Sequence, residues 1–185
     1  MEKEILKNAE QRMKKALEHL RQELASVRTG KATTALLDPV RVEYYGSQVP
    51  LNQVAGVSAP EPRLLVVHPW ERTMVPEVEK AILKADLGLN PASDGTVIRI
   101  PIPSLTEERR LDLVKLVKKM VEEGRVGVRN MRRDGNDEIK KAEKDGRISE
   151  DVSRKTQNEM QKLTDRYIEM MDELLSKKEA EIMEV

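Results

Sequence analysis

Proline is confined to the middle of this chain, and its distribution limits the folds that the chain can adopt. All nine prolines lie between Pro39 and Pro103, in a chain of 185 residues. Because proline removes a backbone donor and breaks a helix interior, long helices are restricted to the two flanks without proline. The sequence therefore predicts helical segments on both sides of a middle segment of a different kind.

Apolar periodicity predicts three long helices in these flanks. In residues 2–28, apolar side chains recur at spacings of three and four, as on one face of a helix. The same period runs from Thr106 to about Lys144, breaks at Asp145–Arg147, and resumes after Ser149, a residue suited to cap a helix. Three helices with one apolar stripe each bury those stripes by packing together, and the short break makes the last two antiparallel.

The middle segment has the alternation and turn residues of a small β-rich unit with one helix. Gly and Pro separate its short apolar runs, which is typical of strands joined by tight turns. The period lengthens once, which predicts a helix at Thr73–Leu87. Strands are expected at Val40–Tyr45, Gln48–Leu51, Val54–Ser58, Arg63–His68 and Thr96–Pro101.

The predicted fold class is α+β, with two domains. Residues 1–30 and 105–185 form a long antiparallel three-helix bundle, and residues 31–104 form a small β/α/β domain inserted between helices 1 and 2. Two chain crossings at one end of the bundle, one with Gly and one with Pro, favour a hinge and an L-shaped molecule. The predicted hinge residues are Thr29, Gly30, Lys31, Pro103 and Ser104.

A row of arginines on the second helix is the strongest candidate for a binding site. Taken at about 100° per residue, the four side chains fall within an arc of roughly 100°, and no carboxylate is expected on that face. They are Arg125, Arg129, Arg132 and Arg133. An apolar stripe is expected on the opposite side of the helix. Its residues are Leu113, Val117, Met120, Gly124, Gly127 and Met131.

Two interpretations of this arginine face remain open on periodicity alone. It can be a solvated flank whose charges pair with the acidic third helix. It can also bind phosphate, because arginine stands there four times in place of lysine and offers a planar fork suited to phosphate. Gly124, Gly127 and Gly135 lie on the same helix and each costs about 1 kcal/mol relative to alanine. Close helix packing and a frayed tip are both possible reasons for them.

No pattern in the chain predicts an enzyme, a cofactor site or a metal site. The two histidines, His19 and His68, lack the spacing of metal ligands or of a catalytic base, and no phosphate-binding glycine motif occurs. Trp70 is expected to anchor the core of the small domain. Only four aromatic residues occur, which argues against a surface that stacks nucleic-acid bases.

Charge and composition narrow the class of partner. The chain has 33 basic and 33 acidic residues, so any recognition of an anion must be local. Cysteine is absent, which excludes disulfides and leaves the cytoplasm as the expected compartment. No stretch has the apolar length of a signal peptide or of a membrane span, so no membrane association is expected.

Several strings, spread over nearly the full length of the chain, carry a resemblance to a known family. They are Val128–Asp134 (VRNMRRD), Ser104–Arg110 (SLTEERR), Val27–Ala32 (VRTGKA), Val42–Gly46 (VEYYG), Val78–Ile82 (VEKAI), Asp86–Pro91 (DLGLNP) and Gln161–Asp165 (QKLTD). These strings resemble the ribosome recycling factor family and occur in family order. The plan of a helix, an insert and two further helices is also that of the family. Gly127, Gly135 and Ala85 depart from the residues more common in it.

The resemblance implies a monomeric cytoplasmic factor that binds the post-termination 70S ribosome across the A and P sites. With elongation factor G and GTP, it would split the ribosome into subunits and release mRNA and tRNA. The family's essential arginines match Arg129 and Arg132, and Arg110 lies in the matching LTEERR string. With Arg125 and Arg133, these are the candidate contacts to large-subunit rRNA. The alternative is a helical adaptor that binds a protein partner.

Overall fold

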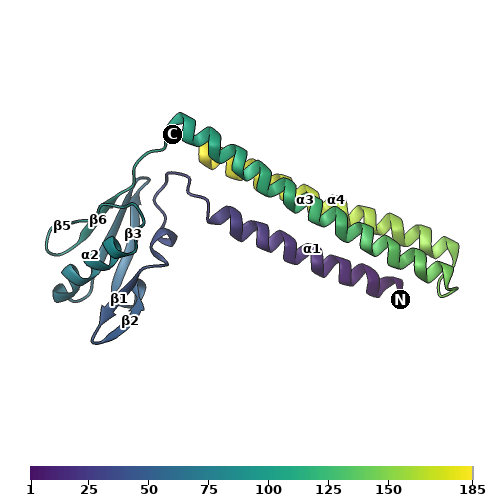
Figure 1. Ribbon diagram of the computed structural model, residues 1–185, viewed down its shortest axis with the longest axis horizontal. Coiled ribbons are helices and arrows are strands. Elements are labelled where there is room, and N and C mark those ends of the chain that lie inside the picture. The colour runs from purple at the N-terminus through teal and green to yellow at the C-terminus, as the bar shows by residue number, and fades with distance from the viewer. Residues whose placement is uncertain (185) are drawn as a thin grey trace. The chain divides into compact units, whose positions relative to one another are not determined.

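The computed structural model describes residues 1–184 and divides into two compact units. One unit consists of Met1–Thr29 together with the chain from Glu107 onward, and the other is Gly30–Thr106. The first is helical and the second is β-rich, which confirms the predicted α+β class with an inserted β-rich unit (Figure 1). None of the helices within residues 1–184 combines the length and the apolar character that crossing a membrane requires.

The helical unit is a bundle of three long helices. They are α1 (Glu2–Ala25), α3 (Glu107–Lys144) and α4 (Glu150–Met183), and each packs on the other two. Helices α3 and α4 are joined by a short link and run antiparallel (Figure 1). Ser149 caps α4 as its sequence position predicts, because its hydroxyl accepts a 3.2 Å hydrogen bond from the backbone N–H of Val152.

The buried line of α3 differs from the predicted stripe. Leu113 and Val117 are buried as expected, but Met120, Gly124, Gly127 and Met131 are only half-buried. The fully buried positions further along the helix are Val121, Val128, Gly135, Ile139 and Ala142. At about 100° per residue, this line is rotated by roughly 45° from the prediction.

The rotation arises because α3 lies between two partner helices. One flank of α3 faces α1, as the ion pair between Arg12 and Asp134 shows, and the other faces α4, as the ion pair between Arg125 and Asp172 shows. A helix between two neighbours buries the line midway between these flanks. The predicted stripe is only the edge of the buried surface that faces α1. The arginines lie on the edge that faces α4, beside the buried line and not on the opposite side of the helix.

Two of the three glycines of α3 mark sites of close helix packing. A Cβ at Gly124 would lie 3.3 Å from Leu20 Cδ2 on α1 and 3.3 Å from Met171 Sδ on α4. A Cβ at Gly135 would lie 2.6 Å from Met160 Cε, inside van der Waals contact. A Cβ at Gly127 would have no heavy atom within 4 Å. Close packing therefore explains Gly124 and Gly135, and nothing in the structure explains Gly127.

The β-rich unit contains two antiparallel sheets and one helix. Strands β1 (Arg41–Tyr44) and β2 (Ser47–Pro50) form a hairpin. The other sheet has the order β3-β4-β6-β5, all antiparallel, in which β3 is Ala55–Glu61, β4 is Leu64–Pro69, β5 is Ala92–Ser93 and β6 is Ile98–Pro101. The predicted strands are present with ends shifted by a few residues. The two-residue strand β5 was not expected.

Helix α2 (Val75–Lys84) is shorter than predicted and packs its apolar face on the core of this unit. The core is aliphatic, with Val67, Val78 and Ile98 among its most buried side chains. Trp70 is not part of it, since 65% of its surface is exposed. Side chains alternate along β4, so that Leu65, Val67 and Pro69 point inward, and Trp70 follows on the outer face.

We expect the glycines of α3 to respond differently to alanine. Gly127→Ala should raise the free energy of unfolding of the bundle by about 1 kcal/mol, because the helix gains propensity and nothing is displaced. The free energy of unfolding of Gly135→Ala should lie below that of Gly127→Ala by at least about 1 kcal/mol, because the buried Met160 must move. Urea unfolding followed by helical circular dichroism measures both, and equal changes would contradict the packing account.

Candidate nucleic-acid interface

The arginines of α3 form a band along the flank that faces α4. Arg125, Arg129 and Arg132 are half-buried, and Arg133 is exposed. The expectation that this face carries no carboxylate is wrong, because Glu122 lies within the same arc. We call Glu122, Arg125, Arg129, Arg132 and Arg133 the arginine face. Its four cations differ sharply in how much of their charge is already paired within the chain.

Arg125 is fully engaged by two carboxylates. Its Nε donates to Asp172 Oδ1 of α4 at 2.7 Å, and its Nη1 donates to Glu122 Oε2 at 2.9 Å. Only 19% of the side chain is exposed. Burial by itself would lower the pKa of Arg125, but the hydrogen bonds to Glu122 and Asp172 outweigh it and raise the pKa. Arg125 therefore braces α3 against α4 and has little capacity left for an outside ligand.

Glu122 is shared between two arginines. Its Oε2 accepts from Arg125, and its Oε1 accepts from Arg129 Nη1 at 3.2 Å. These hydrogen bonds, the one from Arg125 first, lower the pKa of the Glu122 carboxyl, so it is ionised at neutral pH. Glu122, Asp172, Arg125 and Arg129 together carry no net charge, and Arg129 is the cation at the exposed end of this group.

Arg132 and Arg133 keep their full charge. Arg132 Nη1 donates to the neutral amide oxygen of Gln161 on α4 at 3.1 Å, which orients the guanidinium without neutralising it. Arg133 is exposed, and within residues 1–184 no carboxylate lies at ion-pair distance from it or from Arg110, near the start of α3. Arg132 and Arg133 are therefore the cations of this face whose charge no carboxylate of residues 1–184 offsets.

Sequence reasoning found the arginines and offered pairing with the third helix as one interpretation, but it missed Glu122 and did not identify which arginine pairs. The spacing of Glu122 and Arg125, three residues apart on one helix, was a usable signal. Asp172 gave no such signal, because its contact depends on how α3 and α4 are aligned. The interpretation as a flank paired with the acidic third helix describes part of the face, because Arg125 pairs with Asp172, whereas Arg133 lies outside this pairing.

The chain segments that enter and leave the β-rich unit are anchored at one place. The backbone N–H of Ala32 donates to the carbonyl of Pro62 at 2.6 Å, and that of Ile102 donates to the carbonyl of Arg63 at 2.8 Å. Pro62 and Arg63 form the turn between β3 and β4. Gly30 has φ +78°, and a Cβ there would lie 3.0 Å from Leu105 Cγ, so glycine is required. The predicted hinge residues lie just outside the two anchoring bonds, in irregular backbone.

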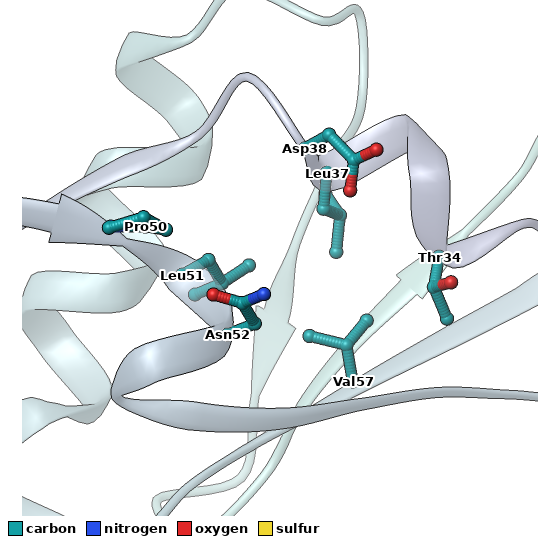
Figure 2. A pocket seen from close by; sticks show the side chains of 7 residues that line it. All are labelled: Thr34, Leu37, Asp38, Pro50, Leu51, Asn52 and Val57. Atoms are coloured by element: carbon teal, nitrogen blue, oxygen red, sulfur yellow. The ribbon is translucent and has the colours of Figure 1, made fainter.

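A cavity of about 230 Å³ in the β-rich unit lacks the cationic lining of an anion site. Figure 2 shows the carboxylate of Asp38 beside Leu37 at the top of the view, the amide of Asn52 beside Leu51, and Val57 below them. No lining residue is basic, and the volume is below the roughly 300–1,000 Å³ of ordinary ligand pockets. The lining residues are Thr34, Leu37, Asp38, Pro50, Leu51, Asn52 and Val57.

The fold and the arginine face define a class of protein: a helical-bundle protein with an inserted β-rich unit and a cationic edge on the bundle. Within residues 1–184, no cluster of histidine and carboxylate side chains could hold a metal ion. Comparison with known proteins agrees with this class and makes it specific.

The sequence profile of the ribosome recycling factor family matches residues 20–183. The ribosome-recycling factor of Symbiobacterium thermophilum is 59% identical over 185 residues, and that of Halalkalibacterium halodurans is 57% identical over 185 residues, each with both chains fully covered. The chain therefore belongs to the ribosome recycling factor family. This family consists of translation factors, and its members are not enzymes.

Solved structures show the same relationship. A solution structure of the ribosome recycling factor superimposes with a TM-score of 0.78 at 46% identity, covering 100% of this chain and 98% of that one. A second structure contains the T. thermophilus ribosome recycling factor and the E. coli elongation factor G bound to the E. coli post-termination complex. It has a TM-score of 0.65 at 48% identity, and both chains are fully covered.

We expect Arg125 and Arg133 to differ in their effect on stability. Arg125→Ala should lower the free energy of unfolding of the bundle by about 1–2 kcal/mol, because Asp172 and Glu122 lose a partly buried partner. Arg133→Ala should change it by less than about 0.5 kcal/mol, since this side chain is exposed. Urea unfolding compares the two variants. Equal losses would show that Arg125 does not brace the helices.

Proposed function

We propose that this chain is a monomeric cytoplasmic ribosome recycling factor. It binds the post-termination 70S ribosome across the A and P sites, chiefly through large-subunit rRNA. With elongation factor G and GTP it splits the ribosome into subunits, so that mRNA and tRNA are released. The proposal rests on the sequence identity of 54–59% between this chain and ribosome-recycling factors, which extends over the full chain. The relative solved with elongation factor G on the post-termination complex supports it.

The proposed rRNA contacts are made by the arginine face. Arg132 and Arg133 supply uncompensated guanidinium groups that can bind phosphate oxygens through two parallel hydrogen bonds. Arg110 extends the contact toward the start of α3. Arg129 also contacts rRNA once its guanidinium separates from Glu122. Arg125 contributes by keeping α4 and α3 together. Phosphate contacts of this kind position the factor without reading a base sequence.

We further propose that residues 1–30 with 105–185 and residues 31–104 act as two domains joined by a double hinge. The hinge consists of Thr29, Gly30, Lys31, Pro103 and Ser104. The hydrogen bonds of Ala32 and Ile102 to the β3–β4 turn support this, because they tie both crossings to the β-rich unit and leave the hinge residues outside the anchored part. A bundle held by rRNA, with a β-rich domain free to swing, could convert the stroke of elongation factor G into separation of the subunits.

Splitting of post-termination ribosomes tests the proposed function. Light scattering should fall when the protein, elongation factor G and GTP are all present, and not when any one is omitted. Arg132→Ala should remove most of the effect, because an uncompensated cation is lost. Arg154→Ala is the matched control, since it removes an exposed arginine of α4 that pairs with Glu150. The proposal fails if the wild-type protein never splits ribosomes with a cognate elongation factor G.

Crosslinking the double hinge tests the swing. The chain has no cysteine, so Thr29→Cys with Ser104→Cys supplies the only thiols for a bifunctional maleimide. The crosslinked protein should still bind 70S ribosomes within about twofold of the wild type but lose splitting, because the bundle contacts are intact and the motion is blocked. Each single-cysteine variant with the same reagent is the control. Undiminished splitting by the crosslinked protein would show that the swing is dispensable.

A further inference from the structure

Glu122 stands out among the acidic residues because it lies inside the face that is to bind phosphate. Its two carboxylate oxygens are held by two different arginines, with Arg125 at 2.9 Å and Arg129 at 3.2 Å. The adjacent Glu123 is also exposed, yet it makes no ion pair with another residue of the described chain, 1–184. A carboxylate beside a phosphate site costs affinity, so its position between two arginines needs an explanation.

We infer that Glu122 is a positioning residue that limits how tightly the arginine face holds rRNA. In the free protein its carboxylate occupies Arg129, and in the complex Arg129 exchanges this carboxylate for a phosphate. This inference rests on the proposed function, because it needs the arginine face to be the rRNA contact. It adds a statement that can be tested separately. Arg129 binds phosphate only after it leaves a carboxylate, and Glu122 supplies that carboxylate.

Arg129 can make this exchange because its internal pair is weak. Its side chain is 43% exposed, that of Glu122 is 52% exposed, and a single nitrogen of the guanidinium makes the contact. Exposed pairs of this kind contribute little, and a phosphate offers the guanidinium two parallel hydrogen bonds. Arg125 cannot exchange in the same way, because it is largely buried and is held by Asp172 as well as Glu122.

Glu122 does not leave when the exchange occurs. Arg125 still holds one of its oxygens, so a carboxylate stays next to the bound phosphate and repels it. The complex is weakened without loss of the arginines that position the factor. A limit on affinity suits a factor that must leave the large subunit after splitting and act again.

Substitution of Glu122 and Glu123 separates this local role from overall charge. Glu122→Gln and Glu123→Gln change the net charge equally at neighbouring positions. Glu122→Gln should bind 50S subunits about two- to fivefold more tightly than Glu123→Gln, because the constraint on Arg129 is removed. The slope of log K against log salt should be the same for both variants, because Arg129 contacts a phosphate in each complex. Glu122→Met, a second uncharged helix former, should reproduce the tighter binding.

A double-mutant cycle with Arg129 makes the test decisive. In an Arg129→Gln background the gain from Glu122→Gln should disappear, because the two side chains act through one contact. A role in stability alone would not tighten binding to 50S subunits, and Asp172 still braces Arg125 in every variant. Equal binding by Glu122→Gln and Glu123→Gln, or a gain that persists without Arg129, would overturn the inference.

The outcomes also separate this inference from the proposed function. If Arg132→Ala weakens binding to 50S subunits while the two glutamate variants bind equally, the arginine face is the contact and only the role of Glu122 is refuted. If the wild-type protein does not bind 50S subunits, or Arg132→Ala binds as tightly as the wild type, the proposed contact itself fails.

Discussion

The packing of α3 between α1 and α4 is the constraint on which the rest of the structure depends. Close approach at Gly124 and Gly135 fixes the rotation of α3 about its own axis, because a side chain at either position would meet Leu20, Met171 or Met160. That rotation decides which flank of α3 lies along α4, and it is the flank that carries the arginines. The hydrophobic core therefore determines where the charge of the protein is presented. A change in α3 packing would move every arginine of the face together.

The positive charge that this face offers to a ligand depends on how strongly each arginine is paired within the chain, and not on the number of arginines. Asp172 and Glu122 neutralise Arg125, Glu122 also holds Arg129, and Arg132 meets only the neutral Gln161. Since phosphate competes only for guanidinium groups that are free or weakly held, the strength of the site depends on this gradation. A protein with no net charge has in this way a short cationic edge without an excess of positive charge over its whole surface.

Much of the fold follows from the sequence, because helical period and the placement of proline are local signals. The three helices, the strands and the capping role of Ser149 needed no knowledge of contacts. Apart from Glu122, whose contacts lie within α3, three errors have a common cause, since each concerned a relation between elements. The buried line of α3 depends on its having two neighbours. The exposure of Trp70 depends on which face of β4 is covered, and the partner of Arg125 lies 47 residues away on another helix. The arginines could be found in the sequence, but their degree of neutralisation could not.

The salt dependence of binding to 50S subunits tests the central claim most directly, with Arg132→Gln and Arg133→Gln combined in one variant. If these uncompensated arginines hold phosphates, the slope of log K against log salt should become shallower by about 1.4–1.8 relative to the wild type, for two lost contacts. The control combines Arg12→Gln with Arg154→Gln, which removes two exposed arginines that pair with Asp134 and Glu150, and it should leave the slope nearly unchanged. A slope that does not change in the first variant, or changes equally in both, would contradict the account.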